Sequence, residues 1–322
     1  MNRYARQMVL PEVGAQGQAR LSCARVLVIG AGGLGCPALQ YLGAAGIGRI
    51  TIMDPDIAEE SNLHRQVLYS MADLGRPKAL AAQEHLVATS PDLKVAALQD
   101  ALTPANAPAL VHDADLVLDC ADSFAVSYIL SDTCHALGKP LISASALGQS
   151  GYVGGFCCGA PSLRAVFPDL PDRAANCATA GVLGPVVGVI GAMQAQMGLQ
   201  VLLGSDPSPL GLLLSFNLGG FRCSSFAFHD APEQDQQMRF ISRCDLTEDD
   251  QIIELRPASE APTLPHPQAR RVAPESLPTL PLQDSARIVL CCRTGLRAWQ
   301  AGRVLQARGL NDVALLADPG AS

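Results

Sequence analysis

The stretch Arg25-Val26-Leu27-Val28-Ile29-Gly30-Ala31-Gly32-Gly33-Leu34-Gly35 decides the fold of this chain. Its apolar, mostly β-branched beginning is typical of a buried parallel strand. The glycines allow a tight turn and a close approach to phosphate oxygens, and a helix beginning there would offer free N–H groups to an anion. A second apolar run, Ile50-Thr51-Ile52-Met53, ends in Asp54, where a carboxylate can accept hydrogen bonds from ribose hydroxyls. This pattern predicts an adenine-nucleotide site formed by Gly30, Gly32, Gly33, Gly35 and Asp54, and it is most common in proteins that bind NAD or FAD.

Length and composition indicate a globular protein. The chain has 322 residues, of which 48% are hydrophobic and 16% charged, enough for one large domain and a smaller one. Its net charge of −7 argues against a general nucleic-acid partner. The first residues lack the apolar core of a signal peptide, so we expect a cytoplasmic location.

Strand and helix patterns alternate over the first ~230 residues, which predicts an α/β fold with a doubly wound, Rossmann-like sheet. The region from Phe216 to Phe228 is expected to add late antiparallel strands. Seven prolines between Pro257 and Pro281 indicate a linker or an extended loop. A short α/β unit follows, with a strand at 287–291 and a helix at 298–308. We therefore expect one domain over residues 1–245 and a compact second one over 246–322.

Polar side chains follow the predicted parallel strands at the edge where such sheets bind ligands. Carboxylates can hold Mg²⁺, and the cations can neutralise a polyphosphate. A nucleotidyl-transfer site needs both, because charge builds on phosphate oxygens in the transition state, whereas a dehydrogenase has little use for them. The residues concerned are Asp54, Asp56, Ser61, Asn62, Arg65, Lys78 and Asp122.

Seven motifs in a fixed order make residues 1–245 resemble the ThiF/MoeB adenylyltransferases, bacterial relatives of ubiquitin-activating enzymes. A glycine-rich loop alone would be a weak signal, but the ordered set is specific. The motifs are Arg3-Tyr4-Ala5-Arg6-Gln7, the 30–35 glycine loop, Asp54-Pro55-Asp56, Ser61-Asn62-Leu63-His64-Arg65-Gln66, Gly75-Arg76-Pro77-Lys78, Asp119-Cys120-Ala121-Asp122 and Cys177-Ala178-Thr179-Ala180-Gly181-Val182.

The resemblance implies that ATP and Mg²⁺ are used to adenylate the C-terminal glycine of a small ubiquitin-like sulfur carrier ending in Gly-Gly. Further implications are a homodimer, in which Arg6 reaches the partner's ATP site, and roles for individual residues. Gly33 would lie against phosphate, Asp54 would hold the ribose, Asn62, Arg65 and Lys78 would bind the triphosphate, and Asp122 would hold Mg²⁺. Cys177 occupies the position of a thiol nucleophile that only some members need.

The chain departs from the family pattern in two places. Ser123 follows the metal aspartate, where the family usually has asparagine. Many members bind structural zinc through two Cys-x-x-Cys pairs, but here the four positions are Ser162, Ala165, Cys244 and Thr247. Because only one thiol remains, we expect no structural zinc.

A second loop, Cys292-Arg293-Thr294-Gly295-Leu296-Arg297, lies between the predicted strand and helix of the C-terminal unit. Backbone N–H groups of such a loop can surround one sulfur atom, and the helix dipole with Arg293 and Arg297 would stabilise a thiolate or persulfide. The loop resembles that of rhodanese-like domains, which implies that Cys292 accepts sulfur from a persulfide donor. Successive strand residues point in opposite directions, so Cys291 is expected to face the core.

Other interpretations remain open at this stage. The segment from Val182 to Gly204 has no charge and is long enough to span a bilayer, but its glutamines and glycines favour a core or subunit-interface helix. An NAD-dependent oxidoreductase and a non-catalytic nucleotide-binding scaffold are the rival functions. The carrier could serve thiamine, molybdenum cofactor or a specialised metabolite.

Overall fold

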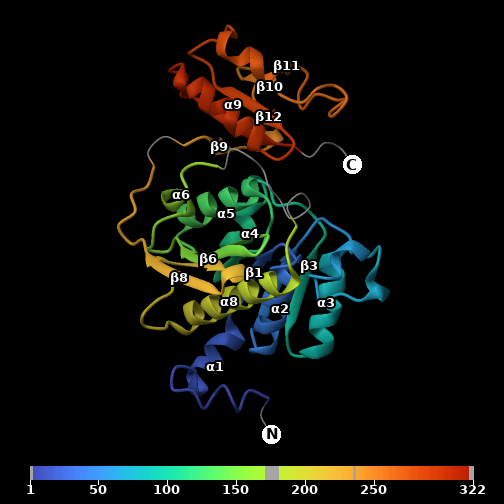
Figure 1. Ribbon diagram of the computed structural model, residues 1–322, viewed down its shortest axis with the longest axis vertical. Helices are drawn as coiled ribbons and strands as arrows, with labels where there is room; N and C mark the ends of the chain where they lie inside the picture. Colours follow the sequence, from blue (N-terminus) through green and yellow to red (C-terminus); the bar gives the residue numbers. More distant parts are fainter. Residues whose placement is uncertain (1–2, 171–180, 235–236, 319–322) are drawn as a thin grey trace.

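The computed structural model describes residues 3–170, 181–234 and 237–318, and it contains two sheets (Figure 1). The larger has eight strands in the order β3-β2-β1-β4-β5-β6-β7-β8. Strands β1 to β5 pair in parallel and β6 to β8 are antiparallel, as the sequence predicts. The strands are β1 (Arg25–Ile29), β2 (Arg49–Met53), β3 (Lys94–Leu98), β4 (Leu116–Asp119), β5 (Leu141–Leu147), β6 (Ser150–Phe156), β7 (Leu212–Asn217) and β8 (Arg222–Ala227).

Helices cover both faces of this sheet because its strands are apolar on both sides. In β1, Val26 and Val28 belong to one buried cluster and Leu27 and Ile29 to the other. The first cluster includes side chains of α2, α3 and α8, and the second includes side chains of α4 and α5. The helices are α1 (Gly14–Cys23), α2 (Gly35–Ala44), α3 (Lys78–Thr89), α4 (Ala107–His112), α5 (Phe124–Leu137), α6 (Leu163–Val166) and α8 (Gly184–Leu203).

Helix α8 is the uncharged segment that the sequence analysis singled out. By length and composition it could cross a membrane, but 44% of its most apolar window is buried inside the protein. Its buried side chains, including Val187 and Ile190, pack in the same cluster as α2 and the sheet. At its centre, Gln194 donates hydrogen bonds to the carbonyls of Asp119 (2.6 Å) and Ile142 (3.1 Å). These contacts are those of a core helix.

The second sheet is parallel, has five strands in the order β11-β10-β12-β13-β9, and packs against α9 (Leu296–Ala307). Its edge strand β9 precedes the expected boundary at 245/246 and pairs with the last strand. Within the proline-rich stretch the chain forms a two-residue strand and a 3₁₀ helix at 274–279. The strands are β9 (Arg239–Phe240), β10 (Gln251–Glu254), β11 (Arg270–Arg271), β12 (Ile288–Cys292) and β13 (Val313–Ala317).

One apolar core joins the two units. Leu130 of α5 belongs to the same buried cluster as Trp299 and Leu305 of α9, and Figure 1 shows the C-terminal unit above α5 and α6. The ion pair between Arg303 and Asp169 (3.0 Å) lies at the rim of this contact. The smaller unit therefore packs on the α5 side of the first domain.

Candidate functional site

A cavity of about 680 Å³ opens at the carboxyl ends of β1, β2 and β4. The sequence predicted a site at this edge, and most of the predicted residues come together there. Those that line the cavity are Gly30, Gly32, Gly33, Asp54, Asp56, Asn62, Arg65, Lys78 and Asp122.

The glycine loop owes its shape to two positions that exclude a side chain. Gly30 has a φ of +94°, and a β-carbon there would lie 2.7 Å from the carbonyl oxygen of Cys120. A β-carbon on Gly35 would lie 2.1 Å from the Gly30 carbonyl oxygen. Gly32 has no such close neighbour and leaves its backbone open to the cavity. Gly35 thus packs against the backbone of Gly30 inside the turn, while Gly30, Gly32 and Gly33 line the cavity.

Asp54 ties this loop to the end of β2. One carboxylate oxygen accepts a hydrogen bond from the Ala31 N–H (2.7 Å), and the other accepts one from the Asp56 N–H (2.8 Å). Burial raises the pKa of the Asp54 carboxyl, while the Ala31 hydrogen bond opposes that rise. Each oxygen keeps a lone pair, so the carboxylate can still accept a hydrogen bond from a ligand hydroxyl.

The two positively charged side chains of the cavity, Lys78 and Arg65, each have a polar contact within the protein. Lys78 begins α3 and is buried, with its Nζ 2.9 Å from a carboxylate oxygen of the exposed Asp56. Arg65 donates from Nη1 to the Ser61 carbonyl oxygen (3.1 Å). An anionic ligand can take the place of Asp56 beside Lys78, because the exposed Asp56 carboxylate can turn to solvent.

Asp122 also lines the cavity and is exposed. Among the residues that the structure describes, none forms a hydrogen bond or ion pair with its side chain. An unpaired carboxylate beside a phosphate-sized space is a suitable ligand for a hard cation such as Mg²⁺. Ser123 follows as the N-cap residue of α5, and its side chain makes no capping hydrogen bond.

Three described residues of the predicted nucleotide site, Gly35, Ser61 and Arg6, do not line the cavity. Ser61 donates to a Glu59 carboxylate oxygen (3.2 Å) and stands beside Asn62. Arg6 is exposed in the N-terminal turn region, and its predicted role across a dimer stays a prediction. Cys177 falls outside the described residues.

Aromatic side chains also line this cavity, and the sequence analysis did not predict them. Tyr128, Tyr152 and Phe167 line it together with Leu170. The Tyr152 and Phe167 rings stack with centroids 4.9 Å apart, and the Tyr128 hydroxyl donates to the Phe167 carbonyl oxygen (2.5 Å). These residues come from α5, from an antiparallel strand and from a loop, so no local spacing connects them.

The Cys292 loop adopts the expected strand-to-helix turn. The Sγ atom of Cys292 accepts hydrogen bonds from the Gly295 N–H (3.1 Å) and the Ala298 N–H (3.3 Å), and Gly295 has a φ of +85°. The expectation that both arginines face the sulfur is not met in full, because Arg297 pairs with Glu260 (3.1 Å). Arg293 is exposed. Cys292 itself is 2% exposed, so its thiol is shielded in this arrangement.

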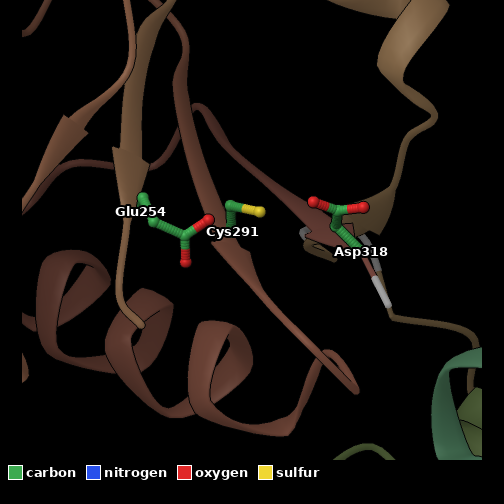
Figure 2. A group of neighbouring side chains, drawn as sticks. All are labelled: Glu254, Cys291 and Asp318. Carbon is green, nitrogen blue, oxygen red and sulfur yellow. The ribbon is translucent and has the colours of Figure 1, made fainter. Parts of the chain in front are cut away.

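Cys291 faces the other side of the second sheet, as predicted. Figure 2 shows its side chain with those of Glu254 and Asp318, three groups close enough together to hold a metal ion. Arg256 occupies this cluster instead, donating to Glu254 (2.7 and 2.8 Å) and to a carboxylate oxygen of Asp318 (2.9 Å). The guanidinium supplies the positive charge that a cation would bring, so the cluster is an internal ion pair.

The residues at the family's zinc-ligand positions make hydrogen bonds of their own, and the pair Ser162–Glu233 is called the polar corner below. Ser162 donates from its N–H and its hydroxyl to the Glu233 carboxylate, both at 2.6 Å, and caps α6. Cys244 contacts the Ser242 hydroxyl (2.9 Å), and the Thr247 N–H donates to Asp250 (2.8 Å). Each of these three residues thus bonds to a different partner, and only Cys244 carries a thiol.

Comparison with known proteins identifies the family of the larger unit. A model of the ThiF family matches residues 4–239. Adenylyltransferase and sulfurtransferase MOCS3 from Bos taurus is 46% identical over 228 residues, which is 69% of this chain and 50% of that protein. Adenylyltransferase and sulfurtransferase uba4 from Emericella nidulans is 46% identical over 217 residues, or 64% of this chain and 45% of that protein. The chain thus spans about half the length of the curated relatives it matches.

Solved structures show the same fold. The crystal structure of E. coli MccB with ATP matches with a TM-score of 0.61 at 22% identity, over 73% of this chain and 74% of that one. Selenomethionine PaaA matches with a TM-score of 0.60 at 23% identity, over 70% and 72%. The family match covers the glycine loop, Asp54, Lys78 and Asp122, which the structure brings to one cavity. The chain belongs to the ThiF family.

Proposed function

We propose that this protein is an ATP-dependent adenylyltransferase that activates the C-terminal glycine of a small ubiquitin-like carrier ending in Gly-Gly. The main support is the cavity that combines the cations Arg65 and Lys78 with the unpaired carboxylate of Asp122. The names of the MOCS3 and uba4 relatives agree with this activity.

ATP would lie with its phosphates on the glycine loop and its ribose at Asp54. Asn62, Arg65 and Lys78 would hold the triphosphate, and Arg6 of the partner protomer would complete the site in a homodimer. The exposed Val9 and Leu10 near Arg6 offer an apolar surface for such a dimer. Asp122 would hold Mg²⁺, which would help to neutralise the negative charge that develops on the phosphates.

In the reaction, a carboxylate oxygen of the carrier attacks the α-phosphorus, the bond to the β-phosphate oxygen breaks, and pyrophosphate leaves. The product is an acyl-adenylate. Lys78 would stabilise the leaving pyrophosphate once the nucleotide displaces Asp56 from it.

The C-terminal unit would then supply sulfur from a persulfide on Cys292. Its terminal sulfur attacks the acyl carbon, AMP leaves, and an acyl disulfide forms. A second thiol, for which Cys177 is the candidate, attacks the Cys292 sulfur and releases the carrier thiocarboxylate. The resulting disulfide is then reduced by an external dithiol. The two N–H groups that point at the Cys292 Sγ support this role, since they stabilise an anionic sulfur.

We further propose a cytoplasmic enzyme without structural zinc, with an adenylation domain over residues 1–245 and a rhodanese-like unit over 246–322. The hydrogen bonds between Ser162 and Glu233 support a zinc-free corner. The sulfur donor would be a protein or small-molecule persulfide.

The test is pyrophosphate release from ATP and Mg²⁺ with and without a purified Gly-Gly carrier. Carrier-dependent release supports adenylation, and a carrier that lacks its last glycine serves as the control. An oxidoreductase would instead bind NADH and show no such release, and a scaffold would bind ATP without turnover. Sulfur transfer is tested separately by thiocarboxylate formation with a persulfide donor, which Cys292→Ser must abolish.

A further inference from the structure

Asp119 is a buried carboxylate for which the described residues provide no counter-charge. It ends β4, and its side chain is 0% exposed. A buried carboxylate costs several kcal/mol unless a cation pairs with it. Within the described part of the chain, no lysine, arginine or histidine forms an ion pair with Asp119. Its described partners are neutral: the Ser143 hydroxyl (2.7 Å) and the Ala121 N–H (3.2 Å) donate to it, and the Ser127 side chain also forms a hydrogen bond with it.

This carboxylate lies directly behind the nucleotide cavity. The residues that follow it in the chain, from Cys120 to Ser123, all line the cavity wall. Burial raises the pKa of Asp119 to about 6, and the nearby charge of Asp122 adds to that rise. The Asp119 and Asp122 carboxylates therefore repel each other at this wall when both are ionised.

The side chain of Asp119 is not what fixes the end of β4. Gln194 of α8 donates to the main-chain carbonyl of Asp119 (2.6 Å), and the Cys120 thiol donates to the Gln194 side chain (3.4 Å). Both contacts persist when only the Asp119 side chain changes. An asparagine there can still accept from the Ala121 N–H, and the Ser143 hydroxyl can rotate to accept from the amide.

We propose that Asp119 is a positioning residue that provides a second negative charge behind Asp122 and so strengthens the binding of the divalent cation that accompanies the nucleotide. Asp119 does not coordinate the cation, because protein atoms cover it completely. Its charge, which no described cation pairs with, destabilises the empty protein, and the bound cation relieves the repulsion between Asp119 and Asp122. This inference rests on the proposed function in that it assumes a nucleotide–cation complex in the cavity.

The test compares the wild type with Asp119→Asn in the full-length chain. Thermal unfolding is followed without ligand, and binding of a non-hydrolysable ATP analogue is measured over a Mg²⁺ titration. We expect Asp119→Asn to raise the melting temperature of the ligand-free protein by about 2 °C or more. We also expect about tenfold more Mg²⁺ to be needed for half-maximal nucleotide binding.

Glu254→Gln is the matched control. It makes the same carboxylate-to-amide change at another buried position, but Glu254 is paired with Arg256 (2.7 Å). It must lower the melting temperature and leave the Mg²⁺ dependence unchanged. A purely structural role of Asp119 predicts the opposite sign, because Asp119→Asn would then lower the melting temperature as Glu254→Gln does.

The outcomes separate this inference from the proposed function. If the wild type binds the analogue with a Mg²⁺ dependence that Asp119→Asn shares, or if the variant melts lower than the wild type, the role of Asp119 is overturned and the proposed function stands. If the wild type shows no Mg²⁺-dependent binding at all, the proposed function falls and this inference falls with it.

Discussion

Gly295 in the Cys292 loop packs against Ala125 in the first turn of α5, where a β-carbon on Gly295 would lie 3.4 Å from that of Ala125. The neighbours of Ala125 on that turn, Phe124 and Val126, line the nucleotide cavity. The two candidate sites are therefore separated by a single turn of helix, yet no residue of the Cys292 loop lines the cavity. In this arrangement Cys292 reaches neither the solvent nor the nucleotide.

The docked position of the C-terminal unit predicts slow chemical modification of Cys292. Its alkylation by iodoacetamide, followed by mass spectrometry of the peptides, should be at least about tenfold slower than that of the exposed Cys158. Arg303→Glu removes the ion pair with Asp169 and should accelerate the reaction. Arg25→Glu breaks a comparable exposed pair elsewhere and should not. Equal rates for Cys292 and Cys158 in the wild type would contradict the docked arrangement.

The polar corner at Ser162 predicts that its hydroxyl is important for stability. Ser162→Ala removes both the α6 cap and a hydrogen bond to Glu233, so the free energy of unfolding should fall by about 1–2 kcal/mol. Urea unfolding measures this, with the exposed Ser276→Ala as the control. A metal chelator should leave the melting temperature unchanged; a drop on chelation, or zinc in the purified protein, would refute the zinc-free corner.

The buried cluster around Arg256 predicts a strong effect of removing the cation. Arg256→Met leaves Glu254 and Asp318 without their partner and should cost about 3–5 kcal/mol of unfolding free energy. Adding Glu254→Gln to that variant should recover part of the loss. Full stability of Arg256→Met in urea unfolding would show that the ion pairs are unimportant.

The same cluster makes the free energy of unfolding depend on pH. Burial pushes the pKa of Glu254 up, but the hydrogen bonds from Arg256 outweigh it and hold that pKa below its usual 4.5. Because the folded pKa is the lower one, this stabilisation is complete above about pH 4.5 and is lost as the pH falls through the folded value. Urea unfolding of the wild type and Glu254→Gln between pH 7 and pH 3.5 should give a difference that narrows at low pH. A difference that widens on acidification would contradict this assignment.

Lys78 is expected to act on the phosphates. Lys78→Met should lower carrier-dependent pyrophosphate release by about 10²–10³-fold, since it removes a preorganised positive charge from the leaving group. The exposed Lys94→Met is the control and should keep full activity. An unchanged rate for Lys78→Met would remove Lys78 from the proposed mechanism.

Much of the fold was predictable because its signals are local. The continuous apolar run Val26-Leu27-Val28-Ile29 indicates a strand buried on both faces. The glycines that follow indicate a tight turn, in which Gly30 and Gly35 leave no room for a side chain. Parallel strands place their carboxyl ends at one edge, so residues as distant as Asp54 and Asp122 could be expected to meet.

The parts that were not predictable depend on tertiary contacts. Tyr152 and Phe167 meet only after an antiparallel strand and a loop have packed together, and β9 is too short to show a periodic pattern. Arg297 turns to Glu260, which lies in the irregular stretch after β10, where sequence rules give no contact. The burial of Asp119 follows from its position beneath Ser143, which its own motif does not reveal.

The connection between the two sheets has a kinetic consequence. Strand β8 ends at Ala227 and β9 begins at Arg239, so the intervening chain can span at most about 40 Å when extended. A group on such a short tether has an effective concentration of roughly millimolar at its target. The proposed handover of sulfur would therefore be unimolecular, its rate would not fall when the enzyme is diluted, and small free thiols would compete only at about millimolar levels.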